Sequence, residues 1–257
     1  MTSSGGSLLS VEDLSKSFGG FLAVRKVSFH VEHGEIVGLV GPNGAGKTTI
    51  FNLLTGFLRA SQGSVVFKGT DITNFRPPDI ARMGVVRTFQ LNKVFPSLTV
   101  ERNIEIGCHK REKGGLMSFL FNPSKQDRDA AREMVEKISE MVGLQDLRKK
   151  TADSLSYGDQ KLLGIGIALG VAPTLLMLDE PFAGMNPKEV MQCVSSLRRI
   201  FEDGTTIFLI DHNMRAVMGF CDRILVVNFG EKVAEGKPDD VCADAAVISC
   251  YLGGSQC

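Results

Sequence analysis

The segment from Gly41 to Thr49 reads GPNGAGKTT and fits the phosphate-binding pattern G-x-x-x-x-G-K-[ST]. In such a loop the glycines let backbone N–H groups close around phosphates, Lys47 supplies a point charge, and the Thr48 hydroxyl is placed to bind Mg²⁺. The apolar run at 36–40 predicts a buried strand before the loop, and residues 49–54 predict a helix after it. This order predicts an α/β core that binds a nucleotide. The residues predicted to hold its phosphates are Gly41, Pro42, Asn43, Gly44, Ala45, Gly46, Lys47, Thr48 and Thr49.

Length and composition indicate an ordinary globular protein. The 257 residues, 43% of them hydrophobic, can form one large domain or a core domain with a subdomain. Lys plus Arg and Asp plus Glu are equal at 29 each, so no overall basic field points to nucleic acid as a partner. No apolar run is long enough to span a bilayer, and the N-terminus does not resemble a secretory signal, so any membrane role requires partners. The six cysteines form no C-x-x-C pair, which indicates reduced thiols and a cytosolic compartment.

The pattern of apolar residues changes twice along the chain. Three β-rich runs between residues 8 and 40, and a fourth at 64–68, predict an antiparallel sheet around the nucleotide core. Residues 91–153 show helical periods, and from 154 onward strands and helices alternate, which predicts a parallel sheet with helices on both faces. We therefore expect a flexible tail at 1–7, a nucleotide-binding α/β core at 8–90 and 154–257, and an inserted helical subdomain at 91–153.

Two carboxylates follow an apolar strand-like run at 175–178. Strand ends in doubly wound sheets are where ligands bind. We expect Asp179 to bind Mg²⁺, directly or through water, and Glu180 to polarise the water that attacks the γ-phosphate of a bound nucleotide. A helix cap or an acidic surface pair has the same sequence pattern, but the phosphate loop upstream favours the metal and water roles.

A helix is predicted to begin at Ser156, which is a suitable N-cap, with Asp159 in its first turn. Alone, the segment indicates a capped helix start, and such a start can also bind phosphate. However, Leu-Ser-x-Gly-x-Gln at 155–160, after a phosphate loop and before an Asp-Glu strand, resembles the signature of ABC-type ATPases. The resemblance covers nearly the whole chain and implies a P-loop ABC ATPase fold with ATP and Mg²⁺ as ligands.

The resemblance implies roles for residues that are uninformative alone. Phe18 matches the aromatic residue that stacks on adenine, Gln90 matches the catalytic and metal-binding glutamine between the core and the helical subdomain, and His212 matches the histidine at the γ-phosphate. Two subunits of this family pair head to tail, either as a homodimer or with a related chain. Ser156 and Gly158 would then contact the nucleotide held by the partner, and ATP would favour the closed dimer.

Several segments, including Val86 to Gln90, residues 181–187 and the ending Tyr251-Leu252-Gly253, are similar to the ATPases of branched-chain amino-acid importers. This implies a peripheral subunit on the cytoplasmic side of the inner membrane, with two permease subunits and, indirectly, a periplasmic substrate-binding protein as partners. Urea or amide importers, the lipopolysaccharide export ATPase and a soluble ABC ATPase acting on ribosomes or DNA are the alternatives. The last of these predicts a basic surface or a long coiled-coil insertion, and the sequence indicates neither.

Two features depart from the common family pattern. Asn186 stands where many members have Asp, although its side chain can still form hydrogen bonds. The signature helix contains Gly164, Gly166 and Gly170, and each interior glycine costs about 1 kcal/mol of helix propensity relative to alanine. We expect these glycines to allow close packing against another element.

Overall fold

The computed structural model describes residues 7–88, 94–108 and 125–252, with the backbone alone at 125–128 and 251–252. Apart from Ser7, the predicted tail at 1–7 lies outside the described residues, and so does Gln90. The strands are β1 (Leu9–Phe18), β2 (Phe21–Val31), β3 (Ile36–Val40), β4 (Gln62–Phe67), β5 (Thr70–Asp71), β6 (Val85–Arg87), β7 (Leu175–Asp179), β8 (Thr206–Ile210), β9 (Arg223–Asn228) and β10 (Glu231–Gly236). The α-helices are α1 (Lys47–Leu54), α2 (Pro77–Arg82), α3 (Val100–Cys108), α5 (Lys125–Met141), α6 (Tyr157–Leu169), α7 (Pro187–Glu202), α8 (Met214–Phe220), α9 (Pro238–Ala243) and α10 (Ala245–Leu252), with short 3₁₀ turns at Gln145–Leu147 and Ala152–Ser154.

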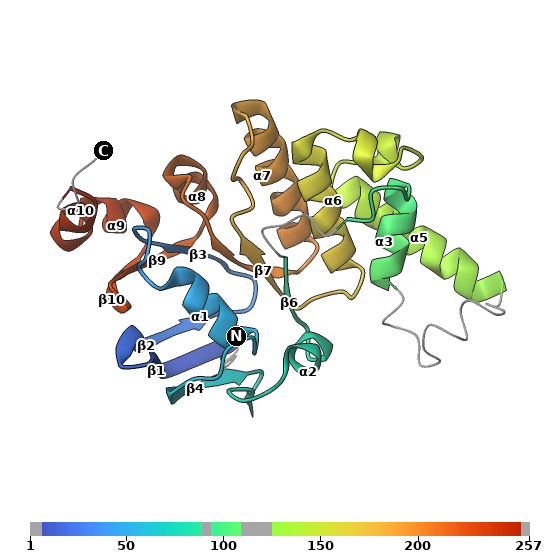
Figure 1. The fold of residues 1–257 in the computed structure, drawn as a ribbon. Helices are drawn as coiled ribbons and strands as arrows, with labels where there is room; N and C mark the ends of the chain where they lie inside the picture. The colour runs from blue at the N-terminus through green and yellow to red at the C-terminus, as the bar shows by residue number, and fades with distance from the viewer. Residues whose placement is uncertain (1–6, 89–93, 109–124, 253–257) are drawn as a thin grey trace, which may run out of the picture.

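The strands form two sheets (Figure 1). The antiparallel sheet has the order β2-β1-β4-β5. The second sheet has the order β10-β9-β3-β8-β7-β6 and is parallel except for β10. The carboxyl ends of β3 and β7 therefore lie at the same edge of this mostly parallel sheet, with β8 between them. This brings the phosphate loop and the Asp-Glu pair to one edge.

The predicted antiparallel sheet differs from the observed one in one strand. Its first two runs are β1 and β2, but the third run, β3, lies inside the mostly parallel sheet between β9 and β8. The reason is that β3 is buried along its whole length, as expected of a strand covered on both faces. The predicted helix start at Ser156 and the strand-like run at 175–178 match α6 and β7, which begin at Tyr157 and Leu175.

Two hydrophobic cores cover the two faces of the mostly parallel sheet. Val37 and Leu39 of β3 belong to the core that includes α1 and the antiparallel sheet. Ile36 and Val40 of the same strand face the other way, into the core that includes α3, α5, α6 and α7. In Figure 1 these helices form a group beyond the sheet from α1. The alternation along β3 therefore places the phosphate-loop helix and the signature helix α6 on opposite faces.

The glycines of the signature helix differ in what surrounds them. A Cβ added at Gly170 would lie 2.4 Å from the carbonyl carbon of Gly107 in α3, so the two helices approach closely there. Gly166 has Ile138 and Ile104 in ordinary contact, from 3.4 Å. A Cβ at Gly164 would meet nothing within 4 Å. The packing explanation therefore holds for Gly170, whereas an alanine Cβ would fit at Gly166 and at Gly164.

No helix of the described residues is long and apolar enough to cross a bilayer. Among the cysteines in the same part of the chain, none forms a disulfide. Cys193 and Cys221 are buried, and burial raises the pKa of the Cys193 thiol to about 12. Cys193 is thus a hydrophobic core residue.

Candidate site for nucleotide binding and hydrolysis

The predicted phosphate loop connects β3 to α1, and its backbone depends on glycine. Gly46 has φ 100° and is the N-cap of α1, and a Cβ there would lie 2.7 Å from the carbonyl oxygen of Ala23. The loop is also tied to the β9–β10 turn, because Gly230 N–H donates to the Ala45 carbonyl at 3.0 Å. Ala23 and Gly230 therefore constrain the loop from two sides. The first turn of α1, which follows the loop, presents N–H groups of the kind that bind phosphate.

Lys47 is the first residue of α1, and its ammonium group folds back onto the loop. Its Nζ donates to the carbonyl oxygens of Gly41 at 2.7 Å and Pro42 at 2.8 Å. Burial lowers the pKa of Lys47, while the carboxylate of Glu180 acts in the opposite direction. The lysine charge thus lies within reach of both the phosphate loop and Glu180, which is where a polyphosphate would need it.

Asp179 ends β7, and its carboxylate is held by Arg87, a residue to which the sequence assigned no role of its own. Arg87 Nη2 donates to Asp179 Oδ2, and the two side chains are only 6% and 9% exposed. Arg87 Nη1 also donates to Asn52 Oδ1 at 2.6 Å, and its guanidinium lies 5.6 Å from the centre of the Phe51 ring. The carboxylate predicted to bind metal is thereby connected to the helix that follows the phosphate loop. The sequence signal for this role of Arg87 is a charged residue placed directly after the apolar residues at 85–86.

Glu180 has an unusual backbone and lies next to the predicted histidine. Its φ is 50°, a conformation that costs a non-glycine residue about 1–3 kcal/mol and is common at functional sites. Its N–H donates to the Ile210 carbonyl at 2.8 Å. The Nδ1 atom of His212 lies 3.9 Å from Glu180 Oε1, and the histidine side chain is 64% exposed. The fold thus brings together two residues that are far apart in the sequence and that were both predicted to be catalytic.

Asp211 organises the two loops that carry these residues. Its side chain is buried, and its carboxylate accepts from the Phe182 N–H and from the Asn213 N–H, each at 2.8 Å. It therefore joins the chain after Glu180 to the chain that contains His212. No role was predicted for Asp211 from the sequence. Its position directly after the apolar run at 206–210 parallels that of Asp179 and could have identified it.

The signature segment forms the predicted capped helix start. The Oγ of Ser156 accepts from the Asp159 N–H at 3.1 Å and donates to Asp159 Oδ2 at 3.0 Å. Gly158 lies directly under Glu189 of α7, since a Cβ at this glycine would lie 2.9 Å from the Glu189 carboxyl carbon. An alanine at position 158 would therefore require the end of the Glu189 side chain to move, and the resemblance implies a nucleotide contact at Gly158 in addition.

Asn186 is the N-cap of α7. Its Oδ1 accepts from the N–H groups of Lys188 and Glu189 at 3.0 Å each, and Glu189 Oε2 accepts from the Asn186 N–H at 3.0 Å. Asn and Asp serve equally well in such a capping box. The departure from the family pattern therefore preserves the start of this helix.

The remaining predicted residues are placed as follows. Phe18 ends β1 with 46% of its surface exposed and with Lys16 Nζ 5.1 Å from its ring centre. Thr48 is exposed in the first turn of α1. A hydroxyl and a carboxylate at one sheet edge, Thr48 and Asp179, are oxygen donors of the kind that Mg²⁺ takes together with water and phosphate oxygens. The residues present therefore fit this ion.

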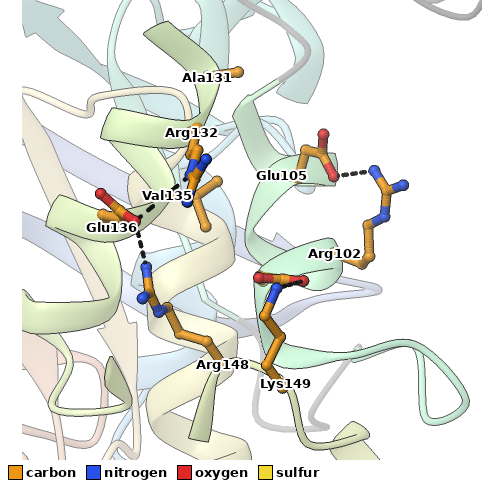
Figure 2. Close-up of a pocket in the computed structure, with 9 residues that line it drawn as sticks. Arg102, Glu105, Ala131, Arg132, Val135, Glu136, Arg148 and Lys149 are labelled. Carbon is orange, nitrogen blue, oxygen red and sulfur yellow. Dashed lines mark hydrogen bonds and ion pairs between the residues drawn. The ribbon is translucent and has the colours of Figure 1, made fainter. Parts of the chain in front are cut away.

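A concave region lies among α3, α5 and the segment at 148–149, with a volume of about 370 Å³ (Figure 2). Charged side chains of both signs line it and pair with one another. Glu136 Oε1 forms ion pairs with Arg148 Nη1 at 2.9 Å and with Arg132 Nε at 3.7 Å. Lys149 Nζ lies 2.9 Å from Glu101 Oε1. This charged pocket is on the helical side of the molecule, away from the phosphate loop.

A phosphate loop after β3, with carboxylates at the same sheet edge two strands away, is the arrangement of P-loop nucleotide hydrolases. The antiparallel sheet beside α1 and the helices packed on the other face narrow the class to ATP-binding cassettes.

Comparisons with known proteins agree with this class. A family profile described as ABC transporter matches residues 24–183, and one described as branched-chain amino acid ATP-binding cassette transporter matches residues 231–256. The chain is 42% identical over 252 residues to the high-affinity branched-chain amino acid transport ATP-binding protein LivG of Escherichia coli, covering 96% of this chain and 98% of that protein. It is 38% identical over 250 residues to BraF of Pseudomonas aeruginosa, with coverage of 96% and 98%.

A solved structure agrees as well. It is the crystal structure of the ADP conformation of an ATP-binding cassette of an ABC transporter, with 34% identity, a TM-score of 0.83, and coverage of 97% of this chain and 100% of that one. The chain belongs to the ABC transporter family as an ATP-hydrolysing cassette, and within it to the branched-chain amino acid transport ATP-binding proteins. The family and the fold class predicted from sequence are confirmed.

Proposed function

We propose that this cassette powers the uptake of branched-chain amino acids from the cytoplasmic side of the inner membrane, as a peripheral subunit bound to two permease chains. The observation that carries the proposal is the 42% identity to LivG, which extends over nearly the full length of both chains. The match of residues 231–256 to a branched-chain amino acid transporter profile adds support from the C-terminal region. We retain the division into a tail at 1–7, a core at 8–90 and 154–257, and a helical subdomain at 91–153.

The proposed hydrolysis uses the residues at one edge of the mostly parallel sheet, together with Phe18 and Gln90. Lys47 and the backbone N–H groups of the phosphate loop bind the phosphates of ATP, and Phe18 stacks on adenine. Thr48, Asp179 and Gln90 would hold Mg²⁺, which would supply positive charge next to the phosphates. Glu180 orients and polarises the attacking water, and His212 contacts the γ-phosphate. The 3.9 Å approach of His212 to Glu180 supports a shared role for these two residues.

We further propose that ATP lies between two cassettes, with Ser156 and Gly158 acting on the partner's nucleotide. Two observations support this. The phosphate-loop helix α1 and the signature helix α6 pack on opposite faces of the mostly parallel sheet. In addition, α6 begins with a side-chain cap in its first turn, which leaves other N–H groups at the helix start to meet an anion. The partner is a second copy or a related cassette.

We propose that the charged pocket on the helical side receives a permease segment. It combines paired charges with a volume of about 370 Å³. Glu105→Arg should reduce recovery of the permeases, because it reverses the charge next to Arg102 in the pocket. Glu12→Arg, on an exposed position of β1, is the matched control and should leave recovery unchanged. Equal recovery with both variants would remove the pocket from this role.

The test of the transport function is affinity purification of the Glu180→Gln chain from membranes of its own source with ATP and Mg²⁺, followed by mass spectrometry. We expect two permease chains and an ATPase partner, because slow hydrolysis holds the closed state. Deleting the chain should abolish uptake of labelled leucine, and the wild-type chain, but not Glu180→Gln, should restore it. Recovery of ribosomal or DNA-bound proteins instead would support the soluble alternative. Restored uptake of urea but not of leucine would correct the substrate.

A further inference from the structure

Lys161 is a buried lysine in α6, and its ammonium group lies against the loop that follows Glu180. The residue is 7% exposed. Its Nζ donates to three carbonyl oxygens, those of Ala183 at 2.7 Å, Glu180 at 2.8 Å and Pro181 at 3.4 Å. An ammonium group has three N–H donors, so these carbonyls match its full capacity.

The buried charge of Lys161 is explained by the polar groups that surround it. Leu162 and Leu163 beside it are buried and apolar, and an apolar residue at 161 would avoid the cost of burying an ammonium group. Burial lowers the pKa of Lys161, and the carboxylate of Asp211 is the strongest influence in the opposite direction. The three carbonyls and Asp211 compensate the buried charge. The carbonyl groups of the loop after Glu180 thus explain why position 161 is a lysine.

The peptide groups of Glu180 are anchored on two sides. Its N–H donates to Ile210 of β8, and its carbonyl accepts from Lys161 of α6. Between these anchors the residue has φ 50°. A left-handed conformation at a residue other than glycine persists only where the surroundings over-determine it. Lys161 is one of the contacts that do so.

We infer that Lys161 is a positioning residue that holds the Glu180 peptide and the loop at 181–183 against α6, so that the Glu180 carboxylate stays directed toward the phosphate loop. This inference rests on the role in hydrolysis proposed for Glu180. It has a consequence for the proposed dimer, because α6 begins at the signature residues Ser156 and Gly158. A shift of α6 on contact with the partner's nucleotide would move Glu180 with it through Lys161.

The first test measures the loop without using activity. Lys161→Met keeps the length of the side chain and removes all three donors. Hydrogen exchange of the full chain, followed by mass spectrometry, should show amides of residues 180–186 exchanging at least about fivefold faster. Lys137→Met is the matched control, because it removes an exposed lysine that also joins two elements, through Asp203. Exchange at 180–186 equal to that of the wild type would overturn the inference.

The second test measures hydrolysis. In Lys161→Met, kcat should fall by at least about tenfold, while the affinity for a fluorescent ATP analogue changes by less than about twofold. Lys161→Arg should recover kcat to within about threefold, because it restores charge and donors. Glu180→Gln with Lys161→Met should be no slower than Glu180→Gln alone, because Lys161 acts through Glu180. Independent, multiplying losses would overturn the inference.

Three further outcomes distinguish a failure of the role of Lys161 from a failure of the role of Glu180. If Lys161→Met does not fold, Lys161→Gln retains two N–H donors on a neutral side chain and should lower kcat by at least about threefold. Wild-type kcat in that variant would overturn the inference. If Glu180→Gln itself leaves hydrolysis unchanged, the proposed role of Glu180 fails and the inference fails with it. If Glu180→Gln is slow but Lys161→Met behaves as the wild type, only the inference on Lys161 fails.

Discussion

Arg87 and Asp179 form an ion pair at 2.5 Å with both side chains more than nine-tenths buried. The pair joins the end of β6 to the end of β7, and Arg87 extends it to Asn52 of α1. Removing one member of a buried ion pair leaves the other charge without compensation, which is more costly than removing both. Asp179, the predicted metal ligand, therefore also contributes to the stability of the core.

We expect Arg87→Met to lower the free energy of unfolding by about 3 kcal/mol, because it leaves the Asp179 carboxylate buried without its guanidinium partner. Urea titration of the full chain measures this change. The double variant Arg87→Met with Asp179→Asn should lose less than the sum of the two single variants. Arg102→Met removes an exposed ion pair and should change stability by less than about 1 kcal/mol. A similarly small change in Arg87→Met would show that the pair contributes little.

Alanine substitutions at Gly164 of α6 and at Gly170, the C-cap of α6, should change stability in opposite directions. Gly170→Ala should destabilise the protein by about 1–3 kcal/mol, because the new Cβ would lie 2.4 Å from the backbone of Gly107. Gly164→Ala should stabilise it by up to about 1 kcal/mol, because alanine favours the helix and nothing lies within 4 Å. Thermal unfolding of the two variants measures both changes. Changes of the same sign in both variants would contradict the packing found at Gly170.

These glycines also show where sequence reasoning ends. Gly164, Gly166 and Gly170 look alike in the sequence, and helix propensity assigns the same cost to each. Which of them meets another backbone depends on where α3 crosses α6, and this crossing is set by packing among residues distant in the sequence. By contrast, the strands β3 and β7 were predictable, because apolar runs bounded by a glycine loop and by two carboxylates are local signals.

Lys47→Ala should weaken binding of ATP to the full chain by at least about tenfold, because the phosphates lose a charge-assisted donor. Isothermal calorimetry measures the affinity. Lys68→Ala is the control, since Lys68 donates to Thr174 on the exposed surface and should leave the affinity unchanged. Equal ATP affinity in Lys47→Ala and the wild type would count against the phosphate loop as the binding site.

The candidate site divides in the same way into predictable and unpredictable parts. Lys47, Asp179 and Glu180 stand in motifs whose chemistry can be read from residue type and spacing. Arg87 and Lys161 act on other residues through contacts that join strands or helices far apart in the chain, so no spacing reveals them. Each carries a buried charge at the edge of an apolar run, and this is the trace that such residues leave in a sequence.

We expect the stability of the protein to depend on pH through the cluster of Arg223, Glu35 and Glu235. Arg223 of β9 holds both carboxylate oxygens of Glu35 at 2.7 and 2.9 Å, and it also contacts Glu235. Burial acts to raise the pKa of Glu35, but the bonds from Arg223 and from the Glu32 N–H outweigh it, so the pKa lies below its usual value of 4.5. A carboxyl whose pKa is lower when folded adds stability above its unfolded pKa. That stability is lost as the pH falls through the folded value.

Arg223→Met should therefore cost about 2 kcal/mol at pH 7, an amount reduced from that of a fully buried pair because the cluster is partly exposed. The difference between variant and wild type should shrink as the pH falls below 4.5 and through the lower folded pKa of Glu35, because the wild type then loses the pair too. Arg25→Met, which removes an exposed contact to Glu231, should show little change at either pH. Urea titrations at both pH values measure the three chains. A difference that stays constant with pH would mean that Arg223 stabilises the fold through packing and its bond to the His30 carbonyl rather than through the charge of Glu35.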